Sequence, residues 1–160
     1  MDDAIKDGDR VYSVIKGMGA ASGGGVDELV PDSRACEEAL RRAYLDARVD
    51  PDSVDFLETH GSGNLAEDAA EARAIVAFFE GGERVRSLKL GSAKERVGHA
   101  GAASSLASIV KASLGLYQEV IPALNSSGGA LKGFAEQPDE FAFPDASQCW
   151  LRDRVDGPRR

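Results

Sequence analysis

The chain has 160 residues, a formal net charge of −8 and 42% hydrophobic residues. This composition is typical of one soluble globular domain with its own core rather than of a disordered chain. The acidic excess argues against a nucleic-acid partner, because phosphate binding requires a basic surface. No apolar run approaches the roughly 20 residues that a membrane span needs, and the acidic N-terminus is unlike a signal peptide. We therefore expect a cytoplasmic protein without a membrane span.

The two cysteines, Cys36 and Cys149, lie far apart and form no CxxC pair. This spacing argues against a zinc site. Cys36 lies in a helix-like segment, where a small buried apolar role is the usual one for a cysteine. We expect neither residue to be a nucleophile, and no disulfide in a reducing compartment.

The first half of the chain alternates between strand-like and helix-like segments. Residues 10–21, "RVYSVIKGMGAA", predict a strand that runs into the glycine-rich loop "SGGG". A helix is predicted from Pro31 to about Ala47, with the proline in its first turn. A turn over residues 49–53 then precedes a short buried strand over residues 54–59, "VDFLET".

The second half repeats this alternation. The pattern predicts a helix over residues 67–82, a strand over 86–93 and a small-residue helix over 98–120. An extended segment over residues 120–125 and one short strand over 140–144 complete the prediction. Strands alternating with helices of this length indicate an α/β fold built in layers.

Both histidines follow predicted strands, at the edge of the sheet where loops converge and chemistry is usually placed. His60 opens the small-residue loop "GSGN", and His99 follows Gly98 at the start of a small-residue helix. A neutral imidazole donates one hydrogen bond, and two such donors meeting at one carbonyl oxygen would stabilise an oxyanion or enolate. The alternative is that each ring is only a structural hydrogen-bonding group. A metal site is disfavoured, because no third ligand stands at the usual spacing.

The two histidine motifs carry a family resemblance. "THGSGNLAEDAAEA" followed by "LGSAKERVGHAGAASSLASIVKA" resembles the β-ketoacyl synthase (ketosynthase) family of fatty-acid and polyketide assembly, whose pattern is HGTGT-x-x-GD-x-x-E and then GS-x-K-x-x-x-GH. The segments "VYSVIKGMGAAS" and "FAFPDASQCWLRDRVDGPRR" look closest to large modular synthases, including those that make polyunsaturated fatty acids. The resemblance implies a thiolase-like layered α/β fold, of which residues 1–160 form the C-terminal half. The family's nucleophilic cysteine, in a TACSSS-type motif, and its closing GFGG loop do not occur in this sequence, so we expect the isolated chain to be inactive.

The resemblance also implies roles for individual residues. His60 and His99 match the active-site histidines that hold the malonyl thioester, assist the loss of CO2 and stabilise the enolate. Lys94 matches the active-site lysine, which sets the local electrostatics. Asp68 and Glu71 match the acids after the first histidine, and we expect Glu71 to pair with Lys94.

Several residues depart from the family pattern. Ser62 keeps the hydroxyl of the family's threonine and is a supporting residue, and Asn64 replaces the second threonine. Glu67 stands where the family usually has glycine, so the loop must rearrange if that backbone needs a positive φ. Arg96 replaces an asparagine common in modular synthases. These departures keep open a weakly active or inactive relative.

The resemblance implies acyl carrier protein as partner, which presents malonyl and acyl thioesters on its phosphopantetheine arm. It implies no further cofactor, and a homodimer or heterodimer in the full protein. Three functions follow: part of a condensing acyltransferase, a non-catalytic partner of the chain-length-factor type, or a module that binds carrier protein. The residue at the nucleophile position of the other half would distinguish the first two.

Overall fold

The computed structural model describes residues 1–25, 32–82, 84–124, 134, 140–153, 155 and 157–160. Within them, the strands β1 (Phe56–Glu58), β2 (Leu88–Gly91) and β4 (Phe141–Ala142) form a parallel sheet in the order β1-β2-β4. Parallel neighbours require a crossover connection, and a helix between β1 and β2 supplies it. The strands β3 (Val120–Ile121) and β5 (Gln148–Cys149) pair antiparallel beside this sheet. The predicted α/β alternation is confirmed.

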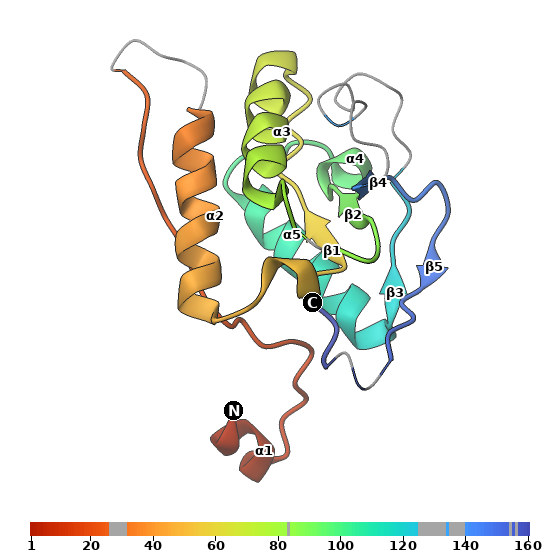
Figure 1. Cartoon of the computed structure of the whole chain (residues 1–160). Coiled ribbons are helices and arrows are strands. Elements are labelled where there is room, and N and C mark those ends of the chain that lie inside the picture. Colours follow the sequence, from red (N-terminus) through yellow and green to blue (C-terminus); the bar gives the residue numbers. More distant parts are fainter. Residues whose placement is uncertain (26–31, 83, 125–133, 135–139, 154, 156) are drawn as a thin grey trace.

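Two long helices pack side by side against the sheet (Figure 1). They are α2 (Ser33–Ala47), which Asp32 caps, and α3 (Leu65–Phe79), which Asn64 caps. The 3₁₀ turn η1 (Pro51–Ser53) joins α2 to β1. A third long helix, α5 (Ala103–Gln118), passes behind β1 in the same view.

The core lies between the sheet and the helices α2 and α3. Leu88 and Leu90 of β2 are fully buried, and they pack with Ile75 and Phe79 of α3 and with Phe141 of β4. Burial of apolar side chains of this size stabilises the fold by roughly 1.5–3 kcal/mol each. This core fixes the end of β1 relative to the end of β2, and the two histidine loops begin at those ends.

The strand predicted over residues 10–21 is wrong. This segment contains no β-strand, because it has no strand partner among the described residues, and it runs as extended chain beside α2. The approach is close: a Cβ atom at Gly19 would overlap the backbone of Ala39 and Ala43 in α2. Gly19 therefore allows this segment to approach α2 closely.

Other predicted helix and strand boundaries also differ from those in the structure. The helix predicted over residues 98–120 begins only at Ala103, after a turn in which Gly98 and Gly101 have positive φ. The helices α1 (Asp2–Asp7) and α4 (Lys94–Val97) and the strand β5 were not predicted. Pro31 and Asn125, which were placed in predicted elements, lie outside the described residues.

Candidate functional site

The end of β1 carries His60 into the site. Thr59 extends the pairing of β1 with β2, because its backbone N–H donates to the Gly91 carbonyl oxygen at 2.7 Å and its hydroxyl donates to the same oxygen at 3.0 Å. The chain then turns at Gly61, which has a φ of 50°. A Cβ atom there would lie 2.7 Å from Oγ of Ser92, so both the conformation and the space require glycine.

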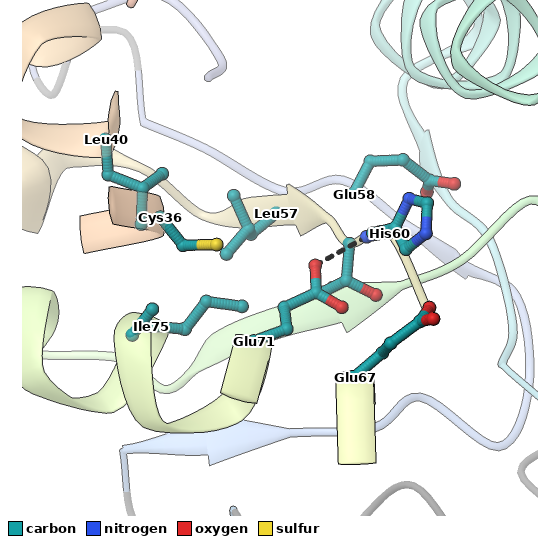
Figure 2. A pocket seen from close by; sticks show the side chains of 10 residues that line it. Cys36, Leu40, Leu57, Glu58, His60, Glu67, Glu71 and Ile75 are labelled. Atoms are coloured by element: carbon teal, nitrogen blue, oxygen red, sulfur yellow. Dashed lines mark hydrogen bonds between the residues drawn. The ribbon is translucent and has the colours of Figure 1, made fainter. Parts of the chain in front are cut away.

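A carboxylate from α3 holds this turn. Glu71 accepts the backbone N–H of His60 at 2.6 Å through Oε1 (Figure 2). Its Oε2 accepts the backbone N–H of Gly61 at 2.9 Å. The expected ion pair between Glu71 and Lys94 is therefore wrong. The two consecutive N–H groups occupy both carboxylate oxygens, and Lys94 has a different partner.

The partner of Lys94 is His60. Lys94 begins α4 just after β2, and its side chain is buried. Its Nζ donates to the carbonyl oxygen of His60 at 2.5 Å and lies 3.1 Å from Nδ1 of the same ring. Because an ammonium group has donors only, Nδ1 must accept, which assigns the proton of a neutral His60 ring to Nε2.

The His99 ring has the same arrangement with a different donor. The backbone N–H of Gly101 donates to Nδ1 of His99 at 3.1 Å, so the proton of the neutral ring again lies on Nε2. The backbone N–H of Ala100 donates to Oγ of the buried Ser104 at 2.9 Å, which fixes the turn before α5. The centroids of the His60 and His99 rings are 5.9 Å apart, and the ring planes meet at 79°. Two exposed imidazoles from separate strand ends thus lie side by side, each with Nε2 left as a donor.

The remaining predicted site residues stabilise the loop that follows His60. The buried carboxylate of Asp68 accepts the hydroxyl of Ser62 at 3.2 Å and the backbone N–H of Gly63 at 3.2 Å. Ser62 Oγ in turn accepts the backbone N–H of Asn64 at 3.1 Å. Glu67 lies in the first turn of the right-handed helix α3, so no positive φ is needed and the loop is not rearranged there.

An apolar cavity of about 270 Å³ opens beside His60 (Figure 2). It is lined by Cys36, Leu40, Leu57, Glu58, Thr59, His60, Glu67, Glu71, Ala74 and Ile75. Burial, followed by the charges of Glu71 and Asp32, raises the pKa of the Cys36 thiol. A raised pKa disfavours the nucleophilic thiolate, and Cys149 is exposed on β5.

One charged pair at the site was missed by the sequence analysis. The carboxylate of Glu58 bonds Nζ of Lys111 on α5 at 2.7 Å, with both side chains mostly buried. Burial raises the pKa of Glu58 above its ordinary value, against the opposing hydrogen bond and charge of Lys111. The available signal was that Glu58 and His60 stand two residues apart, on the same face of an extended chain.

The described part of the chain contains no cluster of three or more His, Cys, Asp or Glu side chains that could hold a metal ion. Among the helices described, none is both long and apolar enough to cross a bilayer.

Comparisons with known proteins all point to one family. The family described as "Beta-ketoacyl synthase, C-terminal domain" matches residues 12–127. The chain is similar to the reducing polyketide synthase BOA9 of Botryotinia fuckeliana, with 37% identity over 124 residues that cover 77% of this chain and 5% of that protein. It is also similar to the highly reducing polyketide synthase azaB of Aspergillus niger, with 33% identity over 165 residues that cover 100% of this chain and 6% of that protein. The chain thus spans only a small part of the length of these relatives.

Similar solved structures are also ketosynthase domains. The ketosynthase domain OzmH KS8 of Streptomyces albus JA3453 superposes with a TM-score of 0.83 at 29% identity, over 93% of this chain and 41% of that chain. The OzmH KS7 domain of the same organism gives a TM-score of 0.82 at 25% identity, over 94% of this chain and 27% of that chain. These matches confirm the expected thiolase-like α/β fold and its C-terminal half.

Proposed function

Because this chain belongs to the β-ketoacyl synthase family, through its C-terminal domain, we propose that it supplies the malonyl-binding histidines of a polyketide ketosynthase. The polyketide synthase relatives support this reading. The single observation that carries the proposal is the pair of rings, His60 and His99, with centroids 5.9 Å apart and each Nδ1 atom 3.1 Å from the nitrogen of a hydrogen-bond donor.

The pair suits the decarboxylation of a malonyl-type thioester. The bond between the α-carbon and the carboxylate carbon breaks, CO2 leaves, and the electron pair of that bond forms the enolate double bond. Negative charge then develops on the thioester oxygen, where two Nε2–H donors would stabilise it most in the transition state. The enolate carbon next attacks an acyl thioester held on a cysteine, the new C–C bond forms, and the cysteine thiolate leaves.

Lys94 acts on this reaction through His60. Its ammonium group bonds both the carbonyl oxygen and Nδ1 of that residue, which orients the ring and keeps its Nε2 a donor. Its positive charge also lies near the developing enolate and favours it. Glu71, Asp68 and Ser62 hold the loop that carries His60, and they touch no substrate in this scheme.

The remaining parts of the reaction belong to a complete ketosynthase. The acyl-carrying cysteine would come from the other half, since the thiolate of Cys36 is disfavoured and Cys149 lies on β5. We expect the 160-residue chain alone to catalyse no condensation. Acyl carrier protein would deliver both thioesters on its phosphopantetheine arm, to a dimeric enzyme in the cytoplasm, without a metal or a further cofactor.

The experiment measures decarboxylation in a complete ketosynthase that contains this chain. His60→Ala and His99→Ala should each lower the rate of CO2 release from a malonyl thioester by about 100- to 1,000-fold, the usual effect of losing one oxyanion donor. Thermal stability should change little, because both rings are exposed. The exposed Ser105→Ala on α5 is the matched control.

Decarboxylation at the parental rate in both histidine variants would refute the proposal. A non-catalytic partner of the chain-length-factor type would instead show no cysteine at the nucleophile position and no acyl-enzyme. A module that only binds carrier protein would bind it without any release of CO2.

A further inference from the structure

A buried ion pair links the strand before His60 to the helix after His99. Glu58 is the last residue of β1, two positions before His60, and Lys111 lies on α5, whose first turn follows His99. Their charged groups are 2.7 Å apart, and the side chains of Glu58 and Lys111 are only 8% and 17% exposed. The pair therefore links β1, which ends two residues before His60, to α5, which begins four residues after His99.

A buried ion pair of this kind is not expected to raise the stability of the fold. Removing two charges from water costs free energy that mutual attraction repays only when every remaining lone pair is satisfied. Oε1 of Glu58 is buried without a hydrogen bond of ordinary geometry among the described residues, although the backbone N–H of Ala93 is near enough to lower the pKa of the carboxyl. Apolar side chains of similar volume would serve packing between β1 and α5 at least as well.

The surroundings favour a role for the charges in geometry. Nζ of Lys111 lies 5.7 Å from the centroid of the Phe56 ring on β1. The lysine is therefore held by two residues of the same strand, the Phe56 ring and the Glu58 carboxylate. The Glu58 carboxylate is also close enough to Lys94 for that ammonium to lower its pKa, although burial outweighs this effect. Glu58 thus lies between the lysine that binds His60 and the helix that follows His99.

We propose that Glu58 and Lys111 form a positioning pair that sets the separation of His60 and His99. This inference rests on the proposed function, because the separation matters only if both rings bind one oxygen atom. The pair acts through the two rings and needs no contact with substrate. A displacement of about 1 Å between two groups that act on one atom can lower turnover by about 100-fold.

The test uses the double variant Glu58→Gln/Lys111→Met in a complete ketosynthase. Removing both charges together avoids leaving one buried and unpaired, so the melting temperature should stay close to that of the parent. The kcat for malonyl-thioester decarboxylation should still fall by about 10- to 100-fold, with little change in KM. Lys111→Arg keeps the charge and should retain most of the activity.

The control is the more exposed pair of Glu37 and Arg41 on α2, whose charged groups are 2.8 Å apart. Glu37→Gln/Arg41→Met should leave both kcat and the melting temperature unchanged. A Glu58/Lys111 double variant with parental kcat, or one whose loss of activity simply follows a loss of stability, would overturn the positioning role.

A crystal structure of the same double variant separates this inference from the proposed function. Rings moved from their 5.9 Å separation would support the positioning role even if the parent released no CO2. Unmoved rings would refute it. A parent that releases no CO2 would count against the proposed function alone.

Discussion

Lys94 binds one residue at two points, since its Nζ lies 2.5 Å from the carbonyl oxygen of His60 and 3.1 Å from Nδ1 of its ring. The first contact fixes the backbone that leaves β1, and the second fixes the rotation of the imidazole. A side chain reaching from the end of β2 thus determines how a ring at the end of β1 presents its Nε2 atom.

Replacing Lys94 with methionine tests this relationship. The change keeps the length of the side chain but removes both hydrogen bonds, so the His60 ring can rotate and either nitrogen can carry its proton. We expect kcat for malonyl-thioester decarboxylation in a complete ketosynthase to fall by up to about 100-fold. Lys6→Met, an exposed lysine on α1, is the control. Turnover unaffected by Lys94→Met would show that the ring is oriented by other means.

The nearness of the two histidines was predictable from the sequence, whereas their hydrogen-bond partners were not. Each ring follows a strand in an alternating pattern, and parallel strands bring their carboxyl ends to one edge. The resemblance pointed to Lys94 and Glu71, and both contact His60 in the structure, but it paired them with each other. Whether a carboxylate meets an ammonium or two backbone N–H groups depends on the rotation of α3 over the loop, and no local pattern encodes that rotation.

Glu71 supports a second prediction, because it accepts two consecutive backbone N–H groups. Glu71→Gln keeps the size of the side chain, but its amide nitrogen cannot accept, so one N–H of His60 or Gly61 loses its partner. The free energy of unfolding should fall by about 1–3 kcal/mol. Amide hydrogen exchange at these two positions should become faster, which locates the loss. Glu80→Gln, at the exposed end of α3, should change neither quantity.

Glu58 and Lys111 show the same limit of sequence reasoning. A glutamate near a strand end and one lysine in the helix segment "SIVKASL" are both typical of solvated surface residues. Only the packing of α5 across β1 buries them against each other. The failed strand over residues 10–21 has a related cause, because alternation predicts strand conformation but supplies no neighbouring strand to pair with.

The exposed apolar face of α5 leads to a third prediction. Large apolar side chains recur on it at helical spacing, with exposures of 45–66%: Leu106, Ile109, Val110 and Leu114. Such a patch favours association. We expect the 160-residue chain to bind the dye ANS and to self-associate, and Leu106→Lys/Val110→Lys to reduce both by several-fold. Ser105→Lys/Gln118→Lys adds the same charge to exposed polar positions of α5. This control should leave both ANS binding and self-association unchanged.

Tyr44 gives a prediction about pH. Its ring on α2 packs against Phe78 and Phe79, and burial raises the pKa of its hydroxyl to about 12, opposed only by the charge of Arg84. In an unfolded chain a tyrosine titrates at about 10. The folded state therefore disfavours the phenolate, so this contribution to stability is complete below about pH 10 and is lost as the pH rises towards 12.

The variant Tyr44→Phe removes the titrating group and keeps the ring contacts with Phe78 and Phe79. The difference between the folded and unfolded pKa values of Tyr44 corresponds to about 2–3 kcal/mol, so the parent should lose about that much more free energy of unfolding than Tyr44→Phe between about pH 9 and pH 12. Urea denaturation at several pH values measures this difference. The phenolate absorbance of the folded parent minus that of folded Tyr44→Phe provides a direct check, and should rise with a midpoint near 12. A midpoint near 10 would mean that water reaches the Tyr44 hydroxyl, and would contradict the packing of α2 against α3 described above.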